Sequence, residues 1–160
     1  MPGISPILYY LFLAIGLAIN IFFCLALIKT LLLVKEVNRR LAPVLIWLLL
    51  IPGFSTFWNF FVAFKLSQSI KNELDSRDFE VDGRPTLISG LSYSIIGFIY
   101  LVFSLVILFN PQKNESDFAI GFNILGLLVI ITFVQYWMKV IWYKKVLQND
   151  EAEIINQEEE

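Results

Sequence analysis

Four long apolar segments constrain this chain more than any other feature. They cover residues 4–34, a second stretch that begins at Pro43, residues 85–109 and residues 118–147. About 20 apolar residues are enough for an α-helix to cross the hydrocarbon core of a bilayer. The sequence therefore predicts an all-α fold, a polytopic helical membrane bundle with four hydrophobic segments.

The distribution of charge agrees with a membrane location. Only 16% of the residues are charged, and the 12 Lys and Arg side chains cluster between the apolar segments. A charge at the centre of a bilayer costs about 2.5–3.5 kcal/mol on insertion scales, so membrane proteins keep charges near the ends of their helices. We expect one helical membrane domain over residues 1–148. Residues 149–160 carry six acidic residues and no basic one, and we expect this tail to be disordered.

The second segment differs from the others because Pro52 and Gly53 interrupt it. Proline inside a helix removes a hydrogen bond and clashes with the preceding turn. An aromatic stretch follows the break, and the segment then becomes increasingly polar up to Leu74. Two interpretations compete: Pro52 kinks one continuous spanning helix, or the chain turns back near this residue and the segment is re-entrant.

Counting basic residues on each side of the membrane favours the second interpretation. Four simple spans would place 7 basic residues on one side and 5 on the other, which is almost no bias. A re-entrant second segment changes the split to 11 against 1, with only Lys113 on the far side. Short loops rich in Lys and Arg stay in the cytoplasm. The counterargument is that non-helical backbone at membrane depth must be covered by protein or water.

The first segment sets the orientation and the expected location. No basic residue precedes it, whereas Lys29 lies near its end and Lys35, Arg39 and Arg40 follow closely. The segment is also too long for the apolar core of a signal peptide, which has roughly 7–15 residues. We therefore expect an uncleaved, multi-pass protein of the cell inner membrane with its N-terminus outside.

Small and polar residues on the helices are candidates for contacts between helices. Asn20 lies on a face with Gly16 and Cys24, and Gly90 lies on a face with Ser94. Small residues allow close helix approach, and polar side chains form hydrogen bonds between helices. The full set of candidate interaction residues is Asn20, Trp58, Asn59, Lys65, Ser69, Glu73, Gln135, Lys139 and Tyr143. We further expect the end of the second segment to pack on the end of the fourth, through Lys65, Glu73, Lys139 and Tyr143.

Groups that carry chemistry are scarce. The chain has no histidine, the commonest general base and metal ligand, and no motif for nucleotide, zinc or nucleophilic chemistry. Four acidic residues at positions 75, 78, 80 and 82 do not have the spacing of a calcium loop. We expect no enzyme, no catalytic residue, no cofactor and no metal. The net charge of −2 argues against nucleic acid as a partner.

Two blocks of sequence resemble a known family. WLLLIPGFSTFWNFFVAFKLSQSIKNEL and VQYWMKVIWYKKVL are similar to blocks in small multi-pass membrane proteins of Bacteroidota-type bacteria, a family with no assigned activity. The resemblance implies a bacterial origin and a membrane location, and it covers about half of the chain. The chain departs from the family pattern at Gly53 and in the low polarity of the loop before the fourth segment. The matching positions are Pro52, Trp58, Lys65, Ser67, Ser69, Asn72, Glu73, Trp137, Lys139 and Tyr143.

The function that these observations favour is a non-enzymatic scaffold or an accessory subunit. Its expected partners are the lipid bilayer, other membrane proteins and further copies of itself. The alternative is an oligomeric pore or carrier for ions or small solutes. Such a path would be lined by Asn20, Asn59, Thr132 and Gln135.

Overall fold

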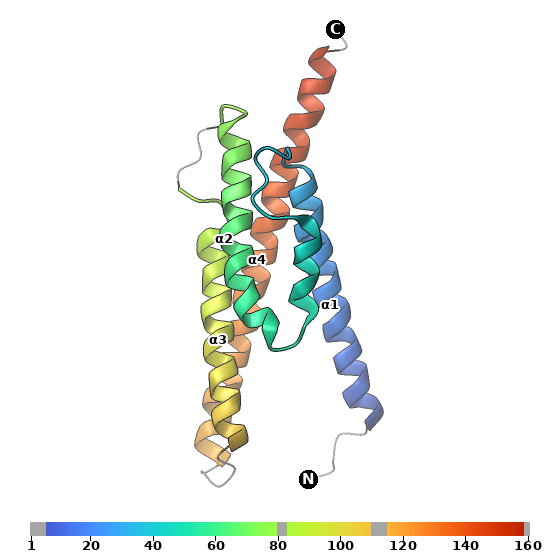
Figure 1. Ribbon diagram of the computed structural model, residues 1–160. Helices are drawn as coiled ribbons and strands as arrows, with labels where there is room; N and C mark the ends of the chain where they lie inside the picture. Colours follow the sequence, from blue (N-terminus) through green and yellow to red (C-terminus); the bar gives the residue numbers. More distant parts are fainter. Residues whose placement is uncertain (1–5, 80–82, 110–114, 159–160) are drawn as a thin grey trace.

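The computed structural model describes residues 6–79, 83–109 and 115–158, and these residues form helices joined by short connections (Figure 1). The elements are α1 (Pro6–Leu32), the 3₁₀ helix η1 (Pro43–Leu50), α2 (Phe54–Asp75), α3 (Leu87–Phe109) and α4 (Glu115–Glu158). No strand occurs within the described ranges. The predicted all-α class is confirmed.

Three of the helices are long and apolar enough to cross a membrane. They are α1, α3 and the part of α4 from Ile120 to Asn149. The second hydrophobic segment of the sequence is not among them, because its residues are divided between η1 and the more polar α2. The chain is therefore a helical membrane protein with three candidate spans among its described residues.

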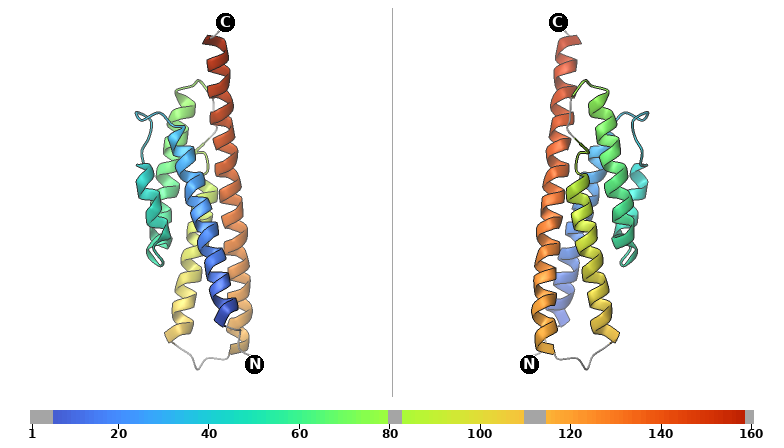
Figure 2. Two further views of the ribbon diagram at one scale, coloured as in Figure 1. Left: turned by 90° about the vertical axis from the view of Figure 1, so that its right-hand side faces the viewer. Right: turned by 90° about the vertical axis from the view of Figure 1, so that its left-hand side faces the viewer.

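The second segment forms a helical hairpin. η1 runs in one direction, the chain reverses at residues 51–53, and α2 runs back beside η1 (Figures 1 and 2). Gly53 has a φ of 78°, which L side chains rarely adopt, and this glycine makes the reversal. The Trp58 indole Nε1 donates to the Leu45 carbonyl at 2.9 Å and ties the two arms together. Pro52 thus marks a turn between two arms, not a kink in one helix.

The hairpin returns the chain to the end of the bundle where it began. The loop of residues 33–42 and the end of α2 both lie at the end where α4 continues upward in Figure 1. The backbone N–H of Arg40 donates to Ser69 Oγ at 2.8 Å, which joins this loop to α2. These segments carry Lys35, Arg39, Arg40 and Lys71, while Lys113, the single basic residue counted on the far side, lies outside the described residues.

α4 is the longest element and continues beyond the apolar region. It has 44 residues and ends at Glu158. Residues 149–158 of the acidic segment, for which disorder was expected, form its last turns in the structure. This end of α4 projects beyond the other helices (Figures 1 and 2).

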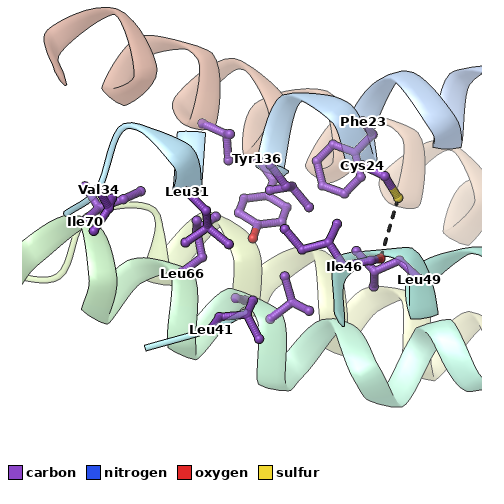
Figure 3. Packing of buried hydrophobic residues seen from close by; sticks show 14 of the residues in the cluster. Phe23, Cys24, Leu31, Val34, Leu41, Ile46, Leu49, Leu66, Ile70 and Tyr136 are labelled. Atoms are coloured by element: carbon purple, nitrogen blue, oxygen red, sulfur yellow. Dashed lines mark hydrogen bonds between the residues drawn. The ribbon is translucent and has the colours of Figure 1, made fainter. Parts of the chain in front are cut away.

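The buried core lies where α1, η1, α2 and α4 meet (Figure 3). Most of the surface of the three candidate spans lies outside this core. Leu27, Leu31, Leu66, Ile70 and Tyr136 are fully buried there. In contrast, only 17%, 6% and 17% of the most apolar windows of α1, α3 and α4 are buried. The exposed remainder is apolar, which is the surface that lipid chains solvate in a membrane.

Gly90 allows α3 to approach its neighbours closely. A Cβ atom added at Gly90 would lie 2.7 Å from the Ala63 Cβ and 3.0 Å from the Tyr136 ring. Gly90 and Ser94 are buried on the same face of α3. This agrees with the expectation that small residues on this face contact other helices.

We predict that Gly53→Ala destabilises the hairpin. A Cβ atom at this position would meet nothing within 4 Å, so the whole cost comes from the positive φ. That cost is about 1–2 kcal/mol. It is measured as a lower unfolding midpoint in detergent.

Gly16→Ala is the matched control for this substitution. A Cβ atom added at Gly16 would also meet nothing within 4 Å, but Gly16 lies inside α1. Alanine is favoured over glycine there by about 1 kcal/mol. Equal effects of the two substitutions would contradict the strained turn.

Candidate functional site

Ser69, Glu73 and Ser76 form a polar face at the end of α2. Their spacing of four and three residues places them on the same side of the helix. Ser69 accepts from Arg40 N–H and donates to its own helix at Lys65 O, at 2.8 Å in both cases. This face therefore holds the loop of residues 33–42 that follows α1.

The Glu73 carboxylate is the centre of this face. Its Oε2 accepts hydrogen bonds from the backbone N–H of Lys35 and from Asn38 Nδ2, both at 2.9 Å. Its Oε1 accepts from Arg77 Nε at 2.9 Å and forms an ion pair with Arg77 Nη2 at 2.8 Å. The Glu73 side chain has no exposed surface, so its charge is stabilised by these groups and not by water.

Arg77 extends the network to α4 and to the loop after α1. Its Nη1 donates to the Leu147 carbonyl of α4 at 3.1 Å, and its Nη2 donates to the Leu33 carbonyl after α1 at 3.3 Å. The guanidinium side chain is 8% exposed. We call Glu73, Arg77, Asn38 and the backbone groups of Lys35, Leu33 and Leu147 the polar lock. It joins the loop after α1, the end of α2 and α4.

The polar lock keeps Glu73 charged. Burial alone would raise the pKa of this carboxyl, but hydrogen bonds from Asn38, Lys35 and Arg77 and the charge of Arg77 together lower the pKa below its usual 4.5. A group whose pKa is lowered by folding stabilises the fold above its unfolded pKa. That contribution is lost as the pH falls through the lowered value.

A second arginine caps α1. Arg39 Nε donates to the Leu31 carbonyl at 3.0 Å, and its Nη2 donates to the Val34 carbonyl at 2.9 Å. These carbonyls lie at the C-terminus of α1, where a cation also opposes the helix dipole favourably. Arg39 thereby directs the chain out of α1 and into the loop that reaches α2.

The other residues expected at this end have different partners. The Lys65 ammonium lies 5.8 Å from the centre of the Phe61 ring, and Lys139 is exposed. Tyr143 packs against the apolar core. Among the described residues, neither Lys65 nor Glu73 has a hydrogen bond or ion pair with Lys139 or Tyr143. The polar connection between α2 and α4 is instead the bond from Arg77 to the Leu147 carbonyl.

A cavity of about 170 Å³ lies at the other end of the hairpin. Asn20 of α1 and Asn59 of α2 both line it, so two of the candidate residues come together here. The other lining residues are Phe23, Leu49, Ser55, Thr56, Tyr93, Ser94, Gly97, Tyr100 and Val129. Every lining side chain is uncharged.

The remaining candidates on α4 do not reach this cavity. Gln135 is exposed, and Thr132 is buried with its hydroxyl bonded to the Leu128 carbonyl at 2.8 Å. Neither belongs to the cavity wall. The four residues expected along one path are therefore divided between a cavity and two separate positions on α4.

Sequence reasoning identified Ser69 and Glu73 but not their partners. Asn38 and Arg77 were not among the candidate residues, although both bind Glu73. The available signal was the spacing of four between Glu73 and Arg77, which permits an ion pair on one helix face. The Leu147 carbonyl gave no signal, because every residue has a carbonyl group.

No family model, curated protein or solved structure matched this chain in the comparisons. The resemblance to the Bacteroidota-type family stays a prediction.

We predict that Glu73→Gln lowers stability by about 3–5 kcal/mol at pH 7. Removing one partner of a buried ion pair leaves the other charge uncompensated, which accounts for this magnitude. The difference from the parent should shrink as the pH falls from 4.5 through the lowered pKa of Glu73, because the folded parent loses its own carboxylate there. Unfolding in detergent across this pH range measures both effects.

Asp75→Asn is the control, because Asp75 is an exposed acid two residues away. We expect it to change stability by less than about 0.5 kcal/mol. A Glu73→Gln protein as stable as the Asp75→Asn protein would contradict the role of the polar lock.

Proposed function

We propose that this chain is a non-enzymatic scaffold or accessory subunit, a multi-pass protein of the cell inner membrane related to the Bacteroidota-type family that it resembles. Its hairpin enters the bilayer from the side of Arg39 and Arg40 and returns to that side. The polar lock and α4 then form a rigid platform on the same side. The projection of α4 beyond the rest of the bundle is the observation that carries this proposal.

The aromatic surface of α2 supports insertion of the hairpin. Phe54, Phe57, Phe61 and Phe64 repeat at intervals of three and four residues and are 42%, 57%, 39% and 40% exposed. In water each such half-exposed side chain would forgo about half of the roughly 1.5–3 kcal/mol that full burial contributes. The stripe ends at Phe64, directly before Lys65. That change from apolar to charged supports a membrane boundary near Lys65.

The other arm has the same character. Val44, Trp47 and Ile51 are 69%, 40% and 47% exposed. Ten residues separate Phe54 from Phe64, which is about 15 Å of helix at 1.5 Å per residue. A bilayer core is about 30 Å thick, so a hairpin of this length reaches about halfway across.

We predict that cysteines on the two ends of α2 differ in reactivity in intact membranes. Phe57→Cys should not react with a membrane-impermeant maleimide, because lipid covers this position. Asp75→Cys should react, and from the same side as Glu36→Cys in the loop after α1. The measurement is the fraction of each protein labelled in sealed vesicles of known orientation.

Labelling in SDS is the control, since all three cysteines should then react. The native Cys24 is fully buried and serves as the internal background. Rapid labelling of Phe57→Cys in membranes would contradict insertion. Labelling of Asp75→Cys from the side opposite to Glu36→Cys would contradict a re-entrant segment.

α4 supplies the surface for a partner. Its 44 residues correspond to about 66 Å of helix, which is about twice the thickness of a bilayer core. After Lys145 the sequence of α4 has no basic residue, and it has acidic residues at positions 150, 151, 153 and 158. An acidic helical arm that projects from the membrane surface suits a partner with a basic segment.

We predict that a photoreactive amino acid at Ala152 forms one discrete adduct with a partner in intact cells. Replacing Asp150, Glu151 and Glu153 with their amides should reduce the adduct about tenfold, because the charge attraction is removed. The yield is measured on affinity-purified protein. Replacing Lys144 and Lys145 with glutamine is the matched control and should not reduce the yield. No discrete adduct, or equal loss in both variants, would contradict an acidic docking arm.

The alternative function is a pore or carrier for ions or small solutes. The shared cavity of Asn20 and Asn59 favours it. The positions of Thr132 and Gln135 outside the cavity wall disfavour a continuous path. Solute flux through the purified protein in liposomes is the measurement that separates the two functions.

A further inference from the structure

The outward side of α2 changes from apolar to polar along its length. Lys65, Gln68 and Asn72 follow Phe61 at steps of four, three and four residues, and such steps keep side chains on one side of a helix. All three are half-buried, so they remain open to a ligand. The exposed aromatic stripe from Phe54 to Phe64 therefore continues directly into a polar face on the same side of the helix.

Two cations lie beside the last rings of the stripe. The Arg84 Cζ atom lies 4.9 Å from the centre of the Phe64 ring, and the Lys65 Nζ atom lies 5.8 Å from the centre of the Phe61 ring. A cation within about 6 Å of a ring centre is attracted to the face of the ring. Lys65 belongs to α2 and Arg84 precedes α3, so two elements bring their charges to the end of one apolar surface.

Neither cation is neutralised within the described part of the chain. The ion pair in this part of the chain joins Glu73 and Arg77, and no hydrogen bond or ion pair joins Lys65 or Arg84 to another described residue. A guanidinium group has five N–H donors and an ammonium group has three. These donors are therefore free to bind an anion from outside the chain.

Arg40 adds a third positive charge to the polar face. When the Asn72 amide is oriented to donate to the Gln68 carbonyl at 3.3 Å, its oxygen accepts from Arg40 Nε at 3.1 Å. Arg40 itself is exposed. The acid of this face, Asp75, has Lys71 four residues before it, and the charges of these two residues offset each other. The face is thus positive overall.

The apolar surface below the cations extends from α2 onto α3. The Phe57 and Phe98 rings meet edge to face, with their centres 5.6 Å apart, and Ile95 and Phe98 are exposed. The stripe on α2 is about 15 Å long, which is about half the thickness of a bilayer core. A lipid chain from one leaflet would therefore run along the whole surface, from the cations to Phe57.

The charge of the polar face selects the headgroup of that lipid. A zwitterionic phospholipid carries its own cation beside the phosphate, so it would leave the charges of the face unbalanced. An anionic phospholipid balances them, and arginine binds two phosphate oxygens at once. Basic side chains close to a membrane surface also attract anionic lipids. A soluble anion would leave the apolar surface uncovered.

We propose that the outward side of α2 and α3 binds one anionic phospholipid. Its phosphate lies at Arg84 and Lys65, and one acyl chain lies along Phe61, Phe57 and Phe98. This site rests on the proposed insertion of the hairpin, because only an inserted hairpin places Phe57 among lipid chains.

The test is native mass spectrometry of the full chain in detergent, titrated with phosphatidylglycerol and with phosphatidylcholine of the same chains. We expect phosphatidylglycerol to bind at least fivefold more tightly. Lys65→Gln and Arg84→Gln should each weaken its binding about fivefold, the expected effect of one cation. Lys145→Gln is the matched control and should not weaken it, because Lys145 is an exposed cation on α4 outside this face.

The position of the lipid is tested in nanodiscs with a phosphatidylglycerol that carries a diazirine in its chain. The adducts should map to residues 57–64 of α2 or 88–98 of α3, and glycerophosphoglycerol, the same headgroup without chains, should not compete. Equal binding of the two phospholipids, equal loss in the Lys145→Gln protein, adducts elsewhere, or full competition by the chain-free headgroup would overturn the proposal.

The labelling of Phe57→Cys separates this proposal from the one on which it rests. A protected Phe57→Cys with no preference for phosphatidylglycerol would overturn the lipid site alone. Rapid labelling of Phe57→Cys in membranes would overturn the insertion of the hairpin and the lipid site together.

Discussion

The buried ion pair between Glu73 and Arg77 determines how this bundle is assembled at one end. Two charges taken out of water are tolerated only when their remaining hydrogen-bonding groups are satisfied. Here the Glu73 carboxylate accepts hydrogen bonds from the Lys35 N–H and the Asn38 amide. The Arg77 guanidinium donates to the carbonyls of Leu33 and Leu147. Lys35, Asn38 and Leu33 belong to the loop after α1, and Leu147 belongs to α4. The pair therefore fixes the loop after α1, the end of α2 and the middle of α4 in one arrangement.

The sequence was sufficient for the class of fold, because length and hydropathy decide which helices can span a bilayer. The reversal at Pro52 and Gly53 was suggested by charge asymmetry, since 11 of the 12 basic residues gather on one side only if the chain turns back. The 3₁₀ geometry of η1 was not predictable. Residues 43–50 are apolar throughout, so they lack the periodicity that distinguishes one kind of helix from another.

The candidate site was predictable only in part, for a physical reason. Glu73 and Ser69 could be selected because polar residues on a largely apolar segment need partners. Their partners in the loop after α1 lie 29 to 38 residues away, and the sequence does not encode the path of that loop locally. The expected pairing with Lys139 and Tyr143 was based on a shared side of the membrane. That condition places helix ends at the same height but does not decide which side chains meet.

The 3₁₀ form of η1 has a consequence for the length of the hairpin. A 3₁₀ helix rises about 2.0 Å per residue and an α-helix about 1.5 Å, so the eight residues of η1 extend about 16 Å and would extend about 12 Å as an α-helix. The outgoing arm is thus stretched to match the first ten or eleven residues of α2. If η1 were an α-helix, the turn at Gly53 would lie about 4 Å closer to the Arg40 end. Because Leu49 lies near the end of η1 and lines the cavity, the winding of this short helix sets the position of one cavity wall.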